Sequence, residues 1–367
     1  MNSFGPGAIT LPTVGLGTVI VSSFVVTLFV AAKLLPGRVR LGVRRDDGTR
    51  KPYKLTGLTL FLGATSLAIG ARVLYGYSFG FVLELFWSLF VAASLISVLV
   101  VVALAVRARD SGSLGDRSLG EVAREVWLGS QRDPTWFGVD LKMFAYQPSL
   151  IGLTLINFAF AFAQHDRHGR LSEQMLLYQA FWWTYVLTHY LNEEFMLTTW
   201  DVIAERFGFM LVWGDLVLVP FFYSIGGWWL VDPGAPLGAP MLVAAIGVYI
   251  LGIVLLRGAN YQKHRFKKDP SARIWGRTAE TIDGKLLVSG FWGIGRKLNY
   301  TGDVCVYLAI AMTTGSSSLA PYLLPAWLAM LLVQRAARDD ARCRAKYGDA
   351  WMEYCARVRF RMIPFIY

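Results

Sequence analysis

Long apolar stretches dominate this chain and restrict what it can fold into. About nine of them are long enough to cross the roughly 30 Å hydrocarbon core of a bilayer as helices. Of the 367 residues, 55% are hydrophobic and only 17% are charged, a balance too apolar for a soluble protein. The sequence therefore predicts an all-α, polytopic membrane bundle of about nine or ten transmembrane helices. The expected spans cover approximately residues 9–35, 55–75, 79–106, 147–164, 173–192, 205–231, 238–256, 300–314 and 318–335.

The chain contains no tandem repeat or low-complexity tract, so we expect a single membrane domain over residues 1–367. Within it we distinguish three parts. Residues 1–136 hold N-terminal helices and a basic loop, residues 137–256 hold spans with many polar side chains, and residues 257–367 form a basic C-terminal part.

Lysine and arginine are concentrated in three connecting segments. Residues 36–54 hold seven of them, residues 257–285 hold eight and residues 335–367 hold eight. Basic segments beside spans favour the cytoplasmic side, so nine spans predict an external N-terminus and a cytoplasmic C-terminus. The net charge of +11 is thus explained by topology, and we expect no nucleic-acid partner. No basic region precedes the first span, and the span has no clear cleavage site. We therefore expect it to be retained and not removed as a signal peptide.

Cysteine and histidine are too few and too scattered for a metal site. The chain has three cysteines, Cys305, Cys343 and Cys355, and four histidines. Their spacing matches no zinc pattern. The cysteines fall in or near the predicted cytoplasmic half, where thiols stay reduced. We expect neither a disulfide nor a bound metal.

Polar side chains enter the membrane in the fifth and sixth predicted spans. Tyr185, His189, Asn192 and Glu193 recur at helical spacing and so share one face. Asp215 lies in the next span, and Trp182 and Trp183 add an aromatic setting. Lipid cannot satisfy so many polar groups, so they must face protein or a cavity. We interpret the cluster as a substrate pocket; for any single residue, an interhelical hydrogen bond is the alternative.

The C-terminal part alternates basic and aromatic residues. It reads NYQKHRFKKDP from Asn260, KLLVSGFWGIGRKLNYTGD from Lys285, and RAARDDARCRAKYGDAWMEYCARVRFRMIPFIY from Arg335. Lysine and arginine side chains can bind the phosphates of a dinucleotide, and aromatic rings can stack on its bases. An amphipathic surface on anionic lipid is the alternative, although interleaved acidic residues do not favour it. The glycines of GFWGIG follow no strand and make no Rossmann fingerprint.

These motifs resemble those of the sterol reductase family, which includes the sterol C14, C7 and C24 reductases and the membrane part of the lamin B receptor. LLVSGFWGIGRKLNYTGD resembles one family signature, and RDDARCRAKYGDAWMEYCARVRFRMIPFIY resembles the other. The stretches DLKMF, LINFAFAF, NEEFMLTTWD and FGFMLVWGDLVLVPFFYS also fit the family pattern. The resemblance covers about residues 137–367. It implies a sterol substrate, NADPH as cofactor, a sterol pocket within residues 137–256 and an NADPH site, facing the cytoplasm, within residues 257–367.

The resemblance assigns the NADPH site residue by residue. Lys267 stands where many members have arginine, which keeps the charge but loses the bidentate fork. Arg335 precedes Asp339 by one helical turn and is expected to line the same site. The implied cofactor residues are Lys263, Lys267, Leu287, Trp292, Asn299, Tyr300, Arg335, Asp339, Cys343, Arg344, Ala345, Lys346, Tyr347 and Tyr354.

The family chemistry is an ionic reduction, in which one alkene carbon is protonated and NADPH delivers a hydride to the resulting cation. Tyr185 matches a sterol-facing tyrosine of the family, so we assign it the proton path, with Glu193 or Asp339 to replenish the proton. Two nearby positions depart from the family pattern: Thr188 replaces a usual aspartate and Leu191 a usual tryptophan. The substrate-binding candidates are Trp182, Trp183, Asn192 and Asp215.

Motifs conflict over which double bond is reduced. LTTWD and FGFML look closer to the C14 reductases, and WGD, IWGR and GFWG closer to the C7 reductases. We therefore expect reduction of a ring double bond at C14 or C7, with side-chain C24 reduction third. The alternative classes are an isoprenylcysteine-type methyltransferase and a non-catalytic sterol-binding membrane protein. A transporter would be expected to have inverted repeats with broken helices, which are not visible here. The oligomeric state is left open.

Overall fold

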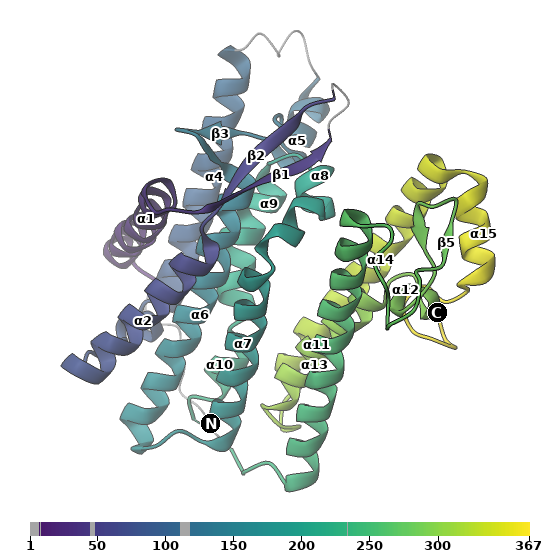
Figure 1. The fold of residues 1–367 in the computed structure, drawn as a ribbon. Helices are drawn as coiled ribbons and strands as arrows, with labels where there is room; N and C mark the ends of the chain where they lie inside the picture. Colours follow the sequence, from purple (N-terminus) through teal and green to yellow (C-terminus); the bar gives the residue numbers. More distant parts are fainter. Residues whose placement is uncertain (1–6, 8, 45–47, 111–117, 233) are drawn as a thin grey trace. The chain divides into compact units, whose positions relative to one another are not determined.

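The computed structural model describes residues 7, 9–44, 48–110, 118–232 and 234–367. It divides into two compact units, residues 1–232 and residues 233–367. The boundary between these units lies before the predicted span at 238–256. The single membrane domain over residues 1–367 stays a prediction. Figure 1 shows that each unit is built mainly from long helices.

The first unit is a helical bundle with two short strand pairs among the residues that the structure describes. Its long helices pack in pairs, α1 against α4, α2 against α6 and α7, and α6 against the π-helix η2. In order, its helices are α1 (Leu11–Leu34), α2 (Gly57–Tyr75), α3 (Phe81–Glu84), α4 (Phe86–Asp110), α5 (Leu119–Leu128), α6 (Leu141–His168), α7 (Glu173–Leu191), η1 (Glu193–Thr198), α8 (Trp200–Ile203), α9 (Phe209–Trp213), η2 (Gly214–Phe222) and α10 (Ile225–Trp229).

Side-chain caps explain where several helices begin. The side chain of Thr10 accepts a hydrogen bond from the backbone of Thr13, and that of Ser172 from Met175. Asp140 does the same for α6, with 2.9 Å between its Oδ1 and the nitrogen of Met143. Each cap satisfies one of the backbone donors that the first turn of a helix leaves unpaired. These capping residues therefore determine where α1, α6 and α7 begin.

The sixth predicted span is not one continuous helix. Residues 209–229 form a short α-helix, a nine-residue π-helix and another short helix. Pro220 lies inside the π-helix, where its ring removes a backbone donor and disturbs regular α-helical bonding. Gly227 lies close to α6, because a Cβ there would approach Asn157 Oδ1 to 3.0 Å. This irregular segment covers the middle of α6.

The predicted basic loop at 36–54 forms an antiparallel hairpin of β1 (Arg38–Arg44) and β2 (Arg50–Leu55). The arginines of β1 are exposed, and so are Val39, Leu41 and Val43. Arg40 Nε lies 3.0 Å from Glu194 Oε2, which ties the hairpin to the segment after α7. A second small hairpin, β3 (Thr135–Trp136) and β4 (Val139–Asp140), leads into α6.

The second unit joins a helical hairpin to a small C-terminal cap. Helices α11 and α13 pack closely, because Gly252 and Gly302 face each other; a Cβ on Gly252 would lie 2.8 Å from the oxygen of Gly302. A strand pair with β5 (Thr281–Ile282) and β6 (Leu286–Leu287) precedes α12. The helices are α11 (Ala239–Lys268), α12 (Phe291–Ile294), α13 (Leu298–Met312), η3 (Ala320–Tyr322), α14 (Leu323–Tyr347) and α15 (Asp349–Arg357).

The all-α polytopic prediction is confirmed. Among the described residues, six helical segments are long and apolar enough to cross a membrane: α1, α2, α4 up to Arg107, α6, the broken segment Phe209–Trp229, and α11. The other three predicted spans also form helices, α7, α13 and α14. These three helices are shorter or less apolar than the six. In particular, α13 has only 15 residues, and the second half of α14 is highly charged.

Candidate functional site

The candidate substrate residues of α7 lie among aromatic side chains. Trp182 is buried, and its ring makes an edge contact with Tyr185 at 5.8 Å and stacks on Tyr223 at 6.3 Å. Tyr185 is only half-buried. The structure therefore brings Trp182 and Tyr185 together, as the sequence predicted, and adds Tyr223 from the segment after η2.

Trp183 belongs to a different contact surface. Its ring packs on Phe61 of α2 at 5.8 Å, beside Tyr190, in the core between α1, α2, α6 and α7. Adjacent residues of a helix point about 100° apart, so Trp182 and Trp183 cannot both lie on one narrow face. Trp183 thus has a clear packing role in this unit.

Asn192 and Glu193 lie where α7 ends, and both have local structural partners. Asn192 Nδ2 donates to the carbonyl of Thr188 at 2.9 Å. The Glu193 carboxylate accepts from the backbone nitrogen of Gly57, with distances of 3.1 and 3.2 Å to its two oxygens. Glu193 therefore caps the first turn of α2. Burial raises the pKa of Glu193 to about 7, although the bond from Gly57 acts in the opposite direction.

The raised pKa of Glu193 predicts a pH-dependent stability. Since its folded value is above the usual 4.5, its contribution is fully present below pH 4.5 and is lost as pH rises through about 7. We expect Glu193→Gln to remove this dependence, which amounts to about 3 kcal/mol at most. Thermal unfolding at pH 5 and pH 8 measures it. Equal pH dependence in the wild type and Glu193→Gln would contradict the raised pKa.

Asp215 lies in η2, and Ser149 of α6 donates a hydrogen bond to it. It borders a narrow crevice together with Lys142, Tyr146 and Asp201. Lys142 is almost fully buried and donates to the backbone carbonyls of residues 201, 202 and 205. Lys142 was not among the predicted site residues; its position inside DLKMF, five residues before the predicted span at 147–164, was the available signal.

In the second unit, Trp292 holds a fixed position beside Lys263. Trp292 Nε1 donates to the carbonyl of Ala259 at 2.8 Å, and Tyr354 donates to the carbonyl of Trp292 at 2.9 Å. Lys263 Nζ lies 5.3 Å from the centre of the Trp292 ring, within the range of a cation–π contact. Leu287 packs in the same small core. Four predicted cofactor residues are therefore brought together.

An ion pair between Lys297 and Asp339 forms the centre of this cluster. Burial would raise the pKa of Asp339, but Lys297 outweighs it and lowers that pKa below the usual value. Burial likewise opposes the charge of Lys297, and Asp339 outweighs it and raises the pKa of that amine. Lys263 and Arg342 lie within electrostatic range of Asp339. An ion-paired carboxylate with a lowered pKa is a poor proton donor, so the geometry favours a positioning role for Asp339 over the predicted catalytic one.

A second ionic group anchors the C-terminal segment. Buried Arg296 lies 3.6 Å from Asp340 and donates to the carbonyl of Val358 at 2.6 Å. Arg361 Nε lies 2.6 Å from the same Asp340. Sequence reasoning named none of Arg296, Lys297, Asp340 or Arg361 as site residues. The basic pair directly before Asn299 was the signal that could have indicated the first two.

Asn299 carries an unused acceptor. Its Nδ2 donates to Asn260 Oδ1 at 3.2 Å, whereas its buried Oδ1 accepts no hydrogen bond from any residue in the described part of the chain. Tyr300 lies beside Lys297, whose Nζ is 5.9 Å from the ring centre. A buried acceptor without a partner is costly, so it fits a ligand that donates an N–H or O–H.

The remaining predicted cofactor residues follow α14. Cys343 and Tyr347 pack against the buried core around Tyr354, and Arg335 is half-buried. Lys267 lies within electrostatic range of Lys346 and Cys343. Arg344, Ala345 and Lys346 are exposed, so any contact they make with a ligand occurs at the surface of this unit.

Comparison with known proteins gives one consistent family. The model of the ergosterol biosynthesis ERG4/ERG24 family matches residues 8–367. A protein from Arabidopsis thaliana named Delta(14)-sterol reductase is 40% identical over 354 residues, which cover 94% of each chain. A Mus musculus protein named Delta(14)-sterol reductase TM7SF2 is 38% identical over 348 residues, 93% of this chain and 83% of that protein.

A third relative is named for a different activity. A protein of Acanthamoeba polyphaga mimivirus named probable 7-dehydrocholesterol reductase is 30% identical over 341 residues, 90% of this chain and 76% of that protein. The match extends over the first 136 residues as well, where the sequence motifs gave no detailed resemblance. The predicted membership is thus confirmed, and this chain belongs to the ergosterol biosynthesis ERG4/ERG24 family, the sterol reductase family whose signatures it carries.

Proposed function

We propose that this protein reduces the C14 double bond of a sterol, with NADPH as the reductant and the cofactor site on the cytoplasmic side. The most similar relatives described above carry the name Delta(14)-sterol reductase, at 40% and 38% identity, whereas the relative named for C7 reduction is 30% identical. This difference is the observation that favours C14 over C7.

The residues of the second unit fit a dinucleotide phosphate. Lys263, Lys267 and Lys297 lie within electrostatic range of Asp339 and Cys343, and Lys346 lies within range of Lys267. Trp292 offers a fixed ring, and Asn299 Oδ1 offers an acceptor for a carboxamide N–H. NADPH, when bound, supplies a hydride. The lysines would hold its phosphates, and the buried side chains would keep water away from its reactive ring.

We place the residue that donates the proton to the alkene in the first unit. Tyr185 is half-buried, and its ring lies against that of Trp182. A phenol placed there can donate a proton to an alkene carbon, and aromatic faces stabilise the carbocation that results. The substrate thus gains one proton from the phenol and one hydride from the reduced cofactor. Tyr185 is left as a phenolate, and a proton supplied through Glu193 would restore the phenol before the next turnover.

A direct assay tests the proposal. The purified protein is incubated with NADPH and a panel of Δ14, Δ7 and Δ24 sterols, and the products are identified by mass and retention time. We expect conversion of the Δ14 sterol alone. Preferred conversion of the Δ7 sterol would refute the C14 assignment, and binding of S-adenosylmethionine in place of NADPH would refute the cofactor.

Cofactor-site variants should weaken NADPH binding more than sterol binding. We expect Lys263→Ala, Asn299→Ala and Arg335→Ala each to lower NADPH affinity about tenfold or more, because each removes a charged or buried polar contact. Isothermal titration with NADPH measures this. Lys268→Ala is the matched control, since Lys268 is exposed on the same helix as Lys263. Unchanged NADPH affinity in all three variants would show that the site lies elsewhere.

A further inference from the structure

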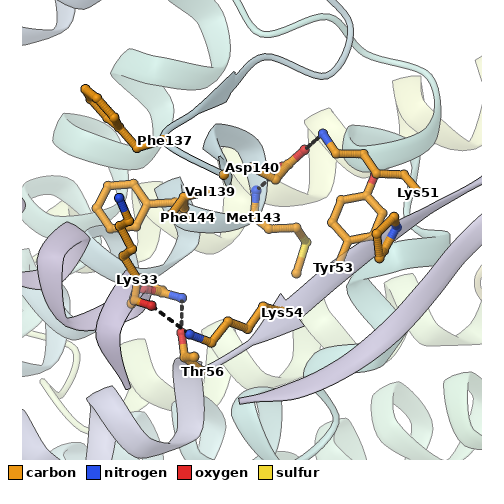
Figure 2. Close-up of a pocket in the computed structure, with 14 residues that line it drawn as sticks. Lys33, Lys51, Tyr53, Lys54, Thr56, Phe137, Val139, Asp140, Met143 and Phe144 are labelled. Atoms are coloured by element: carbon orange, nitrogen blue, oxygen red, sulfur yellow. Dashed lines mark hydrogen bonds and ion pairs between the residues drawn. The ribbon is translucent and has the colours of Figure 1, made fainter. Parts of the chain in front are cut away.

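A cavity of about 240 Å³ lies in the first unit, and none of the residues assigned to the reaction lines it. It is lined by the end of α1, strand β2, the β3–β4 hairpin and the first turns of α6 (Figure 2). Thr56, directly before α2, also lines it. Three candidate membrane spans, α1, α2 and α6, therefore begin or end at this cavity, which places it at the edge of the membrane.

The cavity carries excess positive charge. Three of its lining residues are lysines, Lys33, Lys51 and Lys54, and one is an aspartate, Asp140. Lys51 Nζ is paired with Asp140 at 2.5 Å. Lys54 donates only to the backbone carbonyl of Lys33, at 2.8 Å, and neither Lys33 nor Lys54 pairs with a carboxylate among the described residues. Two ammonium groups are thus left to attract an anion.

The same cavity contains a buried acceptor with no partner. Gln147 is 4% exposed and lines the cavity. Its Nε2 donates to Thr56 Oγ1 at 3.2 Å, whereas its Oε1 accepts no hydrogen bond within the described ranges. The lysines favour an anionic ligand, whereas Gln147 Oε1 favours a ligand that donates a hydrogen bond. One ligand that meets both needs carries a hydroxyl group close to its negative charge.

The rest of the lining is apolar and partly aromatic. Phe144, Met143 and Val139 line one side of the cavity, and Phe137 is 79% exposed beside it (Figure 2). Lys33 Nζ lies 5.4 Å from the ring centre of Phe137. A large exposed aromatic ring next to a cation at the membrane edge suits an amphiphile, whose charged group binds the lysines while its chains stay in lipid.

We propose that this cavity binds the head group of a hydroxylated anionic phospholipid, with its phosphate between Lys33 and Lys54 and its hydroxyl donating to Gln147. Basic pockets between transmembrane helices are suited to such head groups. A soluble phosphate ester shares the charge but would not use the exposed ring. The site is independent of the proposed reduction, because it uses none of the residues assigned to the sterol or to NADPH.

The first test compares lipids on the purified full-length protein. Phosphatidylglycerol, phosphatidylcholine and glycerol 3-phosphate are titrated while thermal unfolding and native mass spectra are recorded. We expect phosphatidylglycerol to bind and to raise the Tm, and the other two to do neither. Equal effects of phosphatidylglycerol and phosphatidylcholine would overturn the proposal. Binding of glycerol 3-phosphate as tight as that of the lipid would overturn it in favour of a soluble ligand.

Variants then test the lysines. Lys33→Met and Lys54→Met should each weaken phosphatidylglycerol binding about fivefold, and the double variant about 25-fold. A lysine near anionic lipid contributes about 1 kcal/mol of binding free energy, which corresponds to about a fivefold change in affinity. Arg38→Gln is the matched control, because Arg38 is exposed on the adjacent strand and does not line the cavity. An equal loss in Arg38→Gln would mean that general surface charge binds the lipid, and the site would be rejected.

A final comparison isolates Gln147. Phosphatidylmethanol has the same charge as phosphatidylglycerol but no hydroxyl in its head group. We expect the wild type to prefer phosphatidylglycerol, and Gln147→Leu to lose this preference while it binds phosphatidylmethanol within about twofold of the wild-type affinity, since a hydrogen bond and not a charge is removed. A preference that persists in Gln147→Leu would refute the role of this side chain.

Discussion

Tyr185→Phe should lower kcat by about 10²- to 10⁴-fold while sterol affinity stays nearly unchanged. The substitution keeps the ring that packs against Trp182 and removes only the hydroxyl. Loss of one proton-transfer group typically costs this much in rate, and the binding surface is preserved. Steady-state turnover of the Δ14 sterol, together with a separate binding titration of the sterol, measures the two quantities independently.

Tyr190→Phe provides the matched control for this prediction. Tyr190 lies on the same helix, and its hydroxyl donates to the carbonyl of Tyr146 at 3.1 Å. Its loss should cost about 1 kcal/mol of stability with little change in kcat. If Tyr185→Phe kept near-normal turnover, Tyr185 would be a packing residue, and the proton would have to come from another group such as Glu193.

Lys297→Met should destabilise the protein by about 3–5 kcal/mol, because it leaves the Asp339 carboxylate partly buried without its partner. The double variant Lys297→Met/Asp339→Leu should recover most of this loss, since replacement of a buried pair by apolar residues is often close to neutral. Denaturant unfolding in mixed micelles measures all three proteins. A double variant as unstable as the single one would show that the ion pair is not the cause.

The same pair predicts a response to acid. The pKa of Asp339 is lowered from the usual 3.8, so its contribution is present above pH 3.8 and is lost as pH falls through the lowered value. The Tm of the wild type should therefore fall more steeply below pH 4 than that of the double variant. Parallel acid profiles of the two proteins would contradict this assignment.

Much of the fold followed from the sequence, because membrane burial leaves a strong and local signal. The predicted spans at 173–192 and 300–314 correspond to α7 and α13 within two residues at each end. The span at 205–231 contains the helical segment 209–229, but this segment is not one regular helix, and Pro220 lies inside its π-helix. Hydropathy averages over about 20 residues and does not resolve such a change of helix type.

The basic segment at 36–54 was correctly identified as polar and was wrongly taken as a simple loop. Its strand pairing depends on register between β1 and β2, which charge counts do not reveal. From the number of lysines and arginines in this segment, we had interpreted its lysines only as residues that orient the protein in the membrane. The cavity that Lys33, Lys51 and Lys54 share with Gln147 exists only because α1, α6 and the β3–β4 hairpin meet there.

Sequence alone determined the membrane class, the family and the set of cofactor candidates, because long apolar runs and two extended motifs are properties of contiguous residues. Tertiary structure decided how those side chains are used. It paired Lys297 with Asp339, placed Glu193 on the first turn of α2, and left Asn299 Oδ1 and Gln147 Oε1 buried without partners in the described chain. The reason is physical: partnership, burial and pKa depend on residues tens of positions apart, and only the folded chain brings these residues within hydrogen-bonding distance.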